Sequence, residues 1–184
     1  MSESPLIRSL NELCLFLDQA GIDYMLIGGL AVGIWGQPRA TVDIDFMISV
    51  STDDFESFRS RATESEQFIF LHNKPMTLRA ISLLRATLRE NPDISVDFLF
   101  ADNEYARQAL KRKERVSLKD FSVNITTPED LILLKLLSGR EQDWIDAAKV
   151  LEIQAGRLDK KYLTSWATKH GIEKLLTSLL GRLP

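Results

Sequence analysis

The chain has 184 residues, of which 45% are hydrophobic and 27% charged, a composition typical of one globular unit. Its net charge of −3 argues against a protein that coats nucleic acid without specificity. The single Cys14 excludes an internal disulfide, and two histidines cannot build a Cys/His zinc site. No apolar stretch approaches the roughly 20 residues that cross a bilayer, and no signal core precedes Leu13, so we expect a cytoplasmic protein without a membrane partner.

The first quarter of the chain predicts a helix, a short strand and a second helix. Leucines recur at three- and four-residue steps over residues 5–20, which is the pattern of an amphipathic helix, and Gly21 closes it. The apolar run 24–27 is typical of a strand that ends at two glycines. Small residues then predict a helix from Leu30 to about Trp35.

Alternating residues predict three further strands. Residues 41–48 alternate apolar side chains with carboxylates, and Thr52 is a candidate cap for a polar helix that runs to about Glu66. Residues 83–89 and 94–100 are separated by turn residues, so they predict a hairpin. A helix over Met76 to Arg89 is the alternative, because leucine and isoleucine also recur there at helical spacing.

The chain beyond Asn103 is mainly helical in pattern, with one or two short strands within 116–125. Thr127 followed by proline and two acids is a strong helix start. Later helices are expected at 140–155, 158–169 and 171–180. We therefore predict an α+β core over residues 1–126, a helical C-terminal subdomain over residues 127–184 packed on it, and a site in the cleft between them.

Three carboxylates are candidates for a metal site. Asp43 and Asp45 are two residues apart on a strand, so both side chains lie on the same face. Two adjacent carboxylates repel each other unless a cation neutralises them, and hard oxygen ligands suit Mg²⁺ bound together with phosphates. Asp97 lies in another strand and could complete a site for two ions. The alternative is an exposed face of an edge strand, with Asp97 unrelated.

Gly28 and Gly29 stand at the end of a strand and the start of a helix. Glycines in this position let backbone amides and a helix N-terminus approach a phosphate closely. A tight turn without function is the alternative interpretation. The residues that follow lack the glycine spacing of the dinucleotide-binding fingerprint.

Lys135 interrupts an apolar helical run, so it either extends to the surface along its apolar neighbours or faces a polar site. In a cleft its ammonium would neutralise phosphate charge in the transition state. Asp143 and Asp146 are one helical turn apart, and Arg140 precedes Asp143 by three residues. A solvated ion pair within the helix and a functional role are equally compatible with this spacing.

Charge is distributed unevenly along the chain. Residues 1–100 contain 8 basic and 14 acidic side chains, a net of −6, whereas residues 101–184 contain 15 and 12, a net of +3. This asymmetry predicts a carboxylate-rich site in the first half and an anion-facing surface in the second. The densest basic cluster consists of Arg107, Lys111, Arg112, Lys113, Arg115 and Lys119. It is either a solvated face or a guide for a polyanionic acceptor such as tRNA.

Paired glycines, two strand acids and a distant third acid together resemble the DNA polymerase beta-like nucleotidyltransferase superfamily. The segment 27–45 is similar, more narrowly, to the minimal nucleotidyltransferases grouped with the AbiEii and MenT toxins. Within it, Arg39 and Thr41 match an Arg-x-Thr-x-Asp-x-Asp pattern. A later motif of that group, Lys-x4-Arg-x2-Asp-x2-Asp, is matched by Lys135, Arg140, Asp143 and Asp146. The resemblance covers residues 5 to 152.

The resemblance implies an enzyme with the nucleotidyltransferase fold, in which a small mixed sheet is flanked by helices. It implies Mg²⁺-dependent transfer of a nucleoside monophosphate from an NTP to an acceptor hydroxyl, and the three acids suit two ions. Asp43, Asp45 and Asp97 are then the metal ligands and, with Lys135, the catalytic residues. The nucleotide-binding residues would be Gly28, Gly29, Arg39, Thr41 and Asp143.

The resemblance leaves the acceptor open among tRNA ends, proteins and small molecules. The narrower expectation is a toxin that modifies RNA and has an antitoxin protein as its partner. An enzyme that modifies small molecules, of the antibiotic nucleotidyltransferase kind, is the competing expectation. A protein that binds nucleotide and a partner without catalysis belongs to a different class, and the presence of all three acids counts against it.

Overall fold

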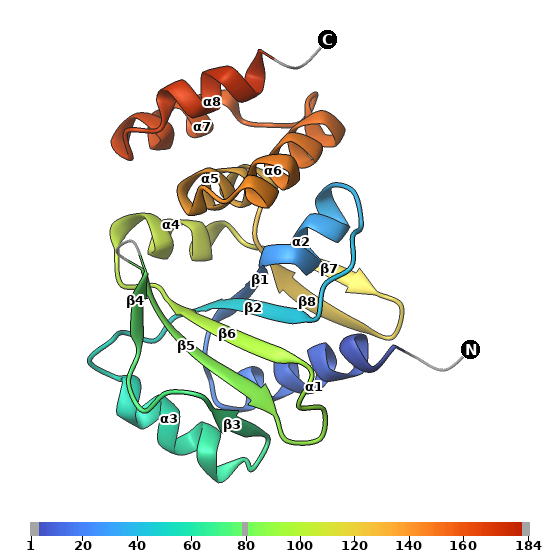
Figure 1. Cartoon of the computed structure of the whole chain (residues 1–184), viewed down its shortest axis with the longest axis vertical. Coiled ribbons are helices and arrows are strands. Elements are labelled where there is room, and N and C mark those ends of the chain that lie inside the picture. The colour runs from blue at the N-terminus through green and yellow to red at the C-terminus, as the bar shows by residue number, and fades with distance from the viewer. Residues whose placement is uncertain (1–3, 79–80, 182–184) are drawn as a thin grey trace.

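The computed structural model describes residues 4–78 and 81–181, which form a mixed β-sheet with helices on both faces (Figure 1). The strands of this part are β1 Tyr24–Ile27, β2 Asp43–Ile48, β3 Phe68–Phe70, β4 Met76–Leu78, β5 Ile81–Leu88, β6 Ser95–Phe100, β7 Glu114–Leu118 and β8 Phe121–Ile125. Their order is β3-β5-β6-β2-β1-β8-β7, and β4 pairs with β5. Two pairs, β2 with β6 and β1 with β8, are parallel. The expected α+β class is confirmed.

Helices cover both faces of the sheet. They are α1 Pro5–Gln19, α2 Gly28–Trp35, α3 Phe55–Glu64, α4 Glu104–Arg112, α5 Pro128–Ser138, α6 Glu141–Gln154, α7 Lys160–Lys169 and α8 Glu173–Leu180. Figure 1 shows α1 and α3 on one side of the sheet and the other helices on the opposite side. The last four helices, α5 to α8, lie together. The predicted core over residues 1–126 and the predicted helical subdomain over residues 127–184 include residues 1–3 and 182–184, which are outside the described part. No helix among the described residues is long and apolar enough to cross a membrane.

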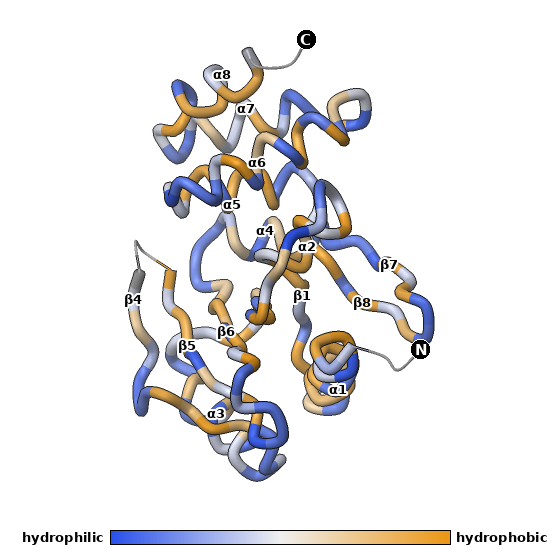
Figure 2. The backbone as a smooth tube through the Cα atoms, turned by 45° about the vertical axis from the view of Figure 1, so that its right-hand side comes forward, coloured by the Kyte–Doolittle hydropathy of each residue, from blue (hydrophilic) through white to orange (hydrophobic). Residues whose placement is uncertain are grey.

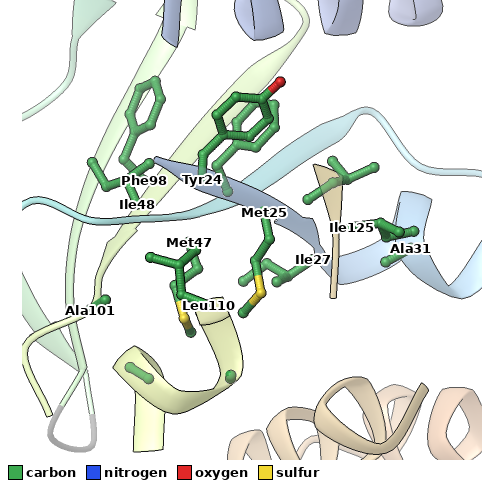
Figure 3. Close-up of a cluster of buried hydrophobic side chains, with 14 of the residues drawn as sticks. Tyr24, Met25, Ile27, Ala31, Met47, Ile48, Phe98, Ala101, Leu110 and Ile125 are labelled. Atoms are coloured by element: carbon green, nitrogen blue, oxygen red, sulfur yellow. The ribbon is translucent and has the colours of Figure 1, made fainter. Parts of the chain in front are cut away.

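The alternation of side chains along the central strands fills two hydrophobic layers. Phe98 on β6 packs edge-on against Phe58 of α3, with ring centroids 5.1 Å apart. Met25 and Met47 point to the other face, toward Leu110 of α4, as Figure 3 shows. β1 is buried along its whole length and leads directly into α2, and both are strongly hydrophobic in Figure 2. The junction between β1 and α2 is therefore anchored in the hydrophobic core through both elements.

The hairpin expected at residues 83–89 and 94–100 is present as β5 and β6, which pair antiparallel. The alternative helix over Met76 to Arg89 is wrong, because its described residues up to Leu88 lie in β4 and β5. Residues 79 and 80 within that range are outside the described part. The cross-strand partners of β5 on both sides explain why strand pairing prevails over a helical pattern.

Two expected helix starts differ from the structure. α2 begins at Gly28 rather than Leu30, so both glycines are its first residues. α3 begins at Phe55, and Thr52 does not cap it, because the backbone N–H of Thr52 donates to Asp102 at 2.9 Å and its hydroxyl donates to the same carboxylate. Asp102, which follows β6, thus binds the groups of Thr52 that would otherwise cap the helix, and α3 begins further along the chain, at Phe55.

Candidate active site

The three candidate carboxylates lie on one face of the two central parallel strands. Asp45 on β2 is directly opposite Asp97 on β6, and Asp43 is opposite Ser95, whose hydroxyl donates a hydrogen bond to the Asp43 carboxylate. β2 lies between β6 and β1, so it is an interior strand. The alternative of an exposed edge strand with an unrelated Asp97 is therefore wrong.

Asp45 is held in an environment that disfavours its charge. Burial, then the neighbouring charges of Asp97 and Asp43, raise its pKa from 3.8 to about 6, although Lys135 and Arg140 act in the opposite direction. Crowded carboxylates of this kind are stabilised by a cation. The arrangement therefore has the chemistry of a cation site at Asp45.

Gly28 brings the start of α2 into contact with Asp45. It has a φ of +66°, and a Cβ at this position would lie 1.9 Å from Oδ2 of Asp45. A side chain at this position would therefore overlap the carboxylate and strain the backbone. The positive φ and this close contact together explain why a glycine stands between β1 and α2.

We expect Gly28→Ala to destabilise the protein by more than about 2 kcal/mol and to abolish activity, because the left-handed backbone cost adds to the displacement of Asp45. Gly21→Ala is a matched control, since Gly21 has a φ of +65° and no neighbouring atom within 4 Å of the added Cβ. We expect it to cost about 1 kcal/mol and to leave activity unchanged. Thermal unfolding and transfer assays on both variants measure the difference, and equal losses would contradict the proposed contact.

The loop between α2 and β2 is tied to α6 by an ion pair. Arg39 donates two hydrogen bonds to Asp146, from Nε to Oδ1 at 3.0 Å and from Nη2 to Oδ2 at 3.1 Å. A Cβ on Gly29 would lie 3.0 Å from Oγ1 of Thr41 and 3.3 Å from Nη2 of Arg39. The structure thus brings Gly29, Thr41 and Arg39 together at the N-terminus of α2.

Lys135 of α5 lies inside a buried polar cluster. Its Nζ is 2.8 Å from Oδ1 of Asp143 and 2.8 Å from Oδ2 of Asp146. The lysine is 5% exposed, so the alternative of a lysine that extends to the surface is wrong. Its charge also reaches Asp45, whose ionised form it favours. Lys135 therefore connects α6 to the carboxylate face of the sheet.

The pair between Arg140 and Asp143 has one buried and one exposed member. Nε of Arg140 is 2.6 Å from Oδ2 of Asp143, and the Asp143 side chain is 1% exposed while that of Arg140 is 75% exposed. Burial opposes the ionisation of Asp143, but hydrogen bonds from Arg140 and Lys135 outweigh it and lower its pKa to about 2. A fully solvated ion pair is thus excluded, and the charged side chain of Arg140 remains exposed beside the buried polar cluster.

Arg85 on β5 is a site residue that sequence reasoning missed. Its Nε donates to Oδ1 of Asp97 at 2.7 Å, and its Nη2 donates to Oδ2 at 2.6 Å. A single arginine on the polar face of an alternating strand is typical of an exposed surface, so only the expected hairpin could have indicated this pair. Hairpin pairing places Arg85 directly opposite Asp97.

The carboxylates fit a divalent cation in part. Asp43 and Asp45 supply adjacent oxygen ligands, and the raised pKa of Asp45 reflects charge repulsion that a cation would relieve. Both oxygens of Asp97 are bonded to Arg85. In the described residues no three Asp, Glu, His or Cys side chains are grouped as a ready metal site. The residues present therefore fit one cation at Asp43 and Asp45, and Asp97 joins them only if Arg85 releases it.

Some cations of the expected basic cluster form ion pairs with acidic side chains of the protein. Arg112 contacts Glu129 at 3.1 Å and Asp130 at 3.2 Å, and Lys113 contacts Asp23 at 2.9 Å. Arg112 also lies over the ring of Tyr162, so it joins α4 to α5 and α7. Arg112 is thus a packing residue, and the cluster is not one free cationic surface.

Arg107 and Lys111 line an open pocket together with Thr52 and Asp102. This pocket lies at the carboxyl ends of β2 and β6, whereas Asp43 and Asp97 lie near the amino ends of these strands. The concave surface at this end is therefore separate from the carboxylate site.

Solved nucleotidyltransferase structures share this fold. An antigenic nucleotidyltransferase-like protein from Paracoccidioides brasiliensis is 17% identical, with a TM-score of 0.54, over 100% of this chain and 95% of its own. The lincosamide antibiotic adenylyltransferase LnuA, solved with lincomycin, is 15% identical, with a TM-score of 0.55, over 79% and 96%. The antibiotic-resistance factor ANT(2'')-Ia is 10% identical, with a TM-score of 0.59, over 92% and 95%. The fold is therefore that of the nucleotidyltransferases.

A family model described as nucleotidyl transferase AbiEii toxin, type IV toxin–antitoxin system, matches residues 13–180. The chain belongs to this family, and the resemblance inferred from its motifs is confirmed. No curated protein sequence matches the chain. The protein is a nucleotidyltransferase that moves a nucleoside monophosphate from an NTP to an acceptor.

Proposed function

We propose that this protein is a magnesium-dependent nucleotidyltransferase that modifies tRNA as the toxin of a toxin–antitoxin pair. The register of Asp45 and Asp97 on adjacent strands, beside the Gly28 start of α2, carries the metal-dependent transfer, and the family description supports the toxin role. Residues 1–126 supply this carboxylate face, and residues 127–184 supply Lys135 and its partners as a helical part. We place the activity in the cytoplasm, where NTP and tRNA are both available.

Asp43 and Asp45 are proposed to hold Mg²⁺, and Asp97, once Arg85 releases it, is the third acid of a site for two ions. When bound, the metal supplies charge neutralisation for the triphosphate and the transition state. Asp97 accepts the proton of the acceptor hydroxyl. The hydroxyl oxygen then bonds to the α-phosphorus, and the bond from that phosphorus to the β-phosphate oxygen breaks, so pyrophosphate leaves.

The remaining site residues are proposed to hold the nucleotide. Backbone N–H groups at Gly28 and Gly29 face phosphate oxygens, as the start of α2 favours anions. Arg39 is oriented by Asp146 and stands over Gly29 next to Thr41, so its guanidinium can bind the triphosphate.

Lys135 and Asp143 are proposed to complete the site from the helical part. The ammonium of Lys135 offsets the charge of Asp45, and Asp143 directs Arg140 toward the nucleotide. The family description supports an antitoxin protein as the partner. The tRNA acceptor agrees with a toxin that acts on a cellular macromolecule.

The acceptor is tested by incubating the purified chain with each α-³²P-labelled NTP and Mg²⁺. Deacylated tRNA, total RNA without tRNA, lysate protein and hydroxyl-bearing antibiotics are offered separately. We expect ribonuclease-sensitive label in the tRNA fraction and none with the Asp45→Asn variant. Label that follows the antibiotics or the lysate protein, with tRNA unlabelled, would overturn the tRNA assignment and leave the nucleotidyl transfer intact.

Salt dependence tests the exposed part of the basic cluster. Each phosphate that a cation neutralises releases counterions, so replacing Arg107 and Lys111 together by glutamine should flatten the fall of tRNA labelling with NaCl. Arg112 is left in place because it is a packing residue. Replacing Lys160 and Lys161 by glutamine makes the same change in charge on α7 and serves as the control. Superimposed salt curves for all three proteins would show that Arg107 and Lys111 do not bind tRNA.

A further inference from the structure

Three residues form one row across three neighbouring strands. Asp45 on β2 is opposite Asp97 on β6, and Asp97 is opposite Arg85 on β5. The guanidinium contacts both oxygens of Asp97, at 2.7 and 2.6 Å. This paired geometry is the strongest that arginine forms with a carboxylate. The third acid of the site is thus fully engaged by a protein cation.

The two members of this pair differ in exposure. The Asp97 side chain is 11% exposed, whereas that of Arg85 is 46% exposed. The hydrogen bonds to Asp97 raise the pKa of Arg85, burial opposes them, and the charges of Asp43 and Asp45 raise it further. Arg85 therefore remains charged and reaches the acids from the solvent side. A long side chain at such a position can turn outward without disturbing the core.

The ion pair contributes little to the fold in this position. The Arg85 side chain is 46% exposed, so solvent screens this pair and it stabilises the protein less than a fully buried ion pair would. Its larger effect is on the charge of the site. A fixed positive charge next to Asp97 repels a second cation and occupies the oxygens that the cation needs.

We propose that Arg85 is a positioning residue that holds Asp97 while the site lacks metal and gives it up when metal binds. The inference rests on the proposed metal-binding role of the three acids and adds a competitor to it. Arg85 keeps Asp97 oriented between turnovers and offsets part of the repulsion between Asp97 and Asp45. Metal affinity is lowered as a consequence, so the site fills efficiently only when the nucleotide phosphates supply further ligands.

Direct binding of Mn²⁺ to the nucleotide-free chain tests this competition. Free Mn²⁺ is measured by electron paramagnetic resonance for the wild type, Arg85→Met, Arg85→Lys and Asp45→Asn. We expect Arg85→Met to bind Mn²⁺ roughly tenfold more tightly, because the hydrogen bonds to a charged group no longer have to be broken. Arg85→Lys keeps the charge and loses the paired geometry, so its affinity should lie between the two.

Controls separate this inference from the proposed function. Arg115→Met makes the same change in net charge on β7 and should leave Mn²⁺ affinity unchanged. Thermal unfolding in EDTA identifies a variant that has lost its fold. If Arg85→Met is unfolded, the Mn²⁺ affinity of Arg85→Lys alone decides the test. If the wild type binds Mn²⁺ through Asp45 while neither Arg85 variant binds more tightly, the competition is wrong and the metal site stands. If neither the wild type nor the Arg85 variants bind Mn²⁺, both proposals fail.

Discussion

Asp45→Asn is expected to reduce nucleotidyl transfer by about 1000-fold or more at saturating Mg²⁺, and Asp43→Asn is expected to do the same. The reason is that loss of a metal-bound carboxylate removes several kcal/mol of charge stabilisation from the transition state. Initial rates of label transfer from α-³²P-NTP measure the effect. Asp53→Asn, an exposed acid outside the carboxylate row, is the control and should retain full activity. Normal rates in both site variants would exclude these acids as metal ligands.

The same substitution should stabilise the metal-free protein at neutral pH. The pKa of Asp45 is about 6 in the folded protein against an ordinary value of 3.8, so the folded state binds its proton more tightly. Stability is therefore lost as the pH rises through this window, by up to about 3 kcal/mol above pH 6.

Asp45→Asn removes this loss, so its unfolding free energy in EDTA should exceed that of the wild type at pH 7.5. The advantage should disappear near pH 4. Denaturant unfolding at the two pH values measures it. A variant less stable than the wild type at pH 7.5 would contradict the repulsion between Asp45, Asp43 and Asp97.

Lys135→Met should destabilise the protein by about 3–5 kcal/mol and abolish transfer. Methionine keeps the apolar stem, but Asp143 and Asp146 would lose their shared cation while 1% and 2% exposed. Arg140 and Arg39 still bind one carboxylate each, but two buried charges would then share one cation fewer, and loss of a partner from a buried ion-pair cluster is costly. Chemical denaturation and transfer below the unfolding temperature measure the two effects.

Lys149→Met is the matched control on α6. Lys149 pairs with Glu152 at 3.0 Å, but the two side chains are 43% and 60% exposed, so the change should cost less than about 1 kcal/mol. The double variant Lys135→Met with Asp146→Asn should recover part of the lost stability, since one buried charge is removed. Unchanged stability of Lys135→Met would mean that its ammonium is not bound in the cluster.

The sequence was sufficient to place the acids on strands but not to align the strands. Alternation put Asp43 and Asp45 on one face, and the turn before residue 94 indicated the hairpin that contains Asp97. The parallel pairing that sets Asp45 opposite Asp97 joins strands about fifty residues apart, and no local pattern encodes it.

Charged residues in helices were predicted less well than those in strands. An isolated lysine in an apolar run is compatible with both an exposed and a buried end, and the acids that bind Lys135 come from the next helix. Arg112 has the sequence context of a surface cation, yet Glu129 and Asp130 draw it into the packing of α4 on α5.

Among the strand residues, Arg85 was missed because its partner is set by strand pairing alone.

Nucleotidyl transfer at the carboxylate site is tested most directly by comparing NTP labelled at the α-phosphate with NTP labelled at the γ-phosphate. Wild type and Asp45→Asn are incubated with each nucleotide, Mg²⁺ and tRNA. We predict that α-label enters the acceptor with stoichiometric release of pyrophosphate, that γ-label leaves as pyrophosphate, and that Asp45→Asn gives neither. Transfer of the γ-label to the acceptor, or unchanged α-label transfer by Asp45→Asn, would contradict it.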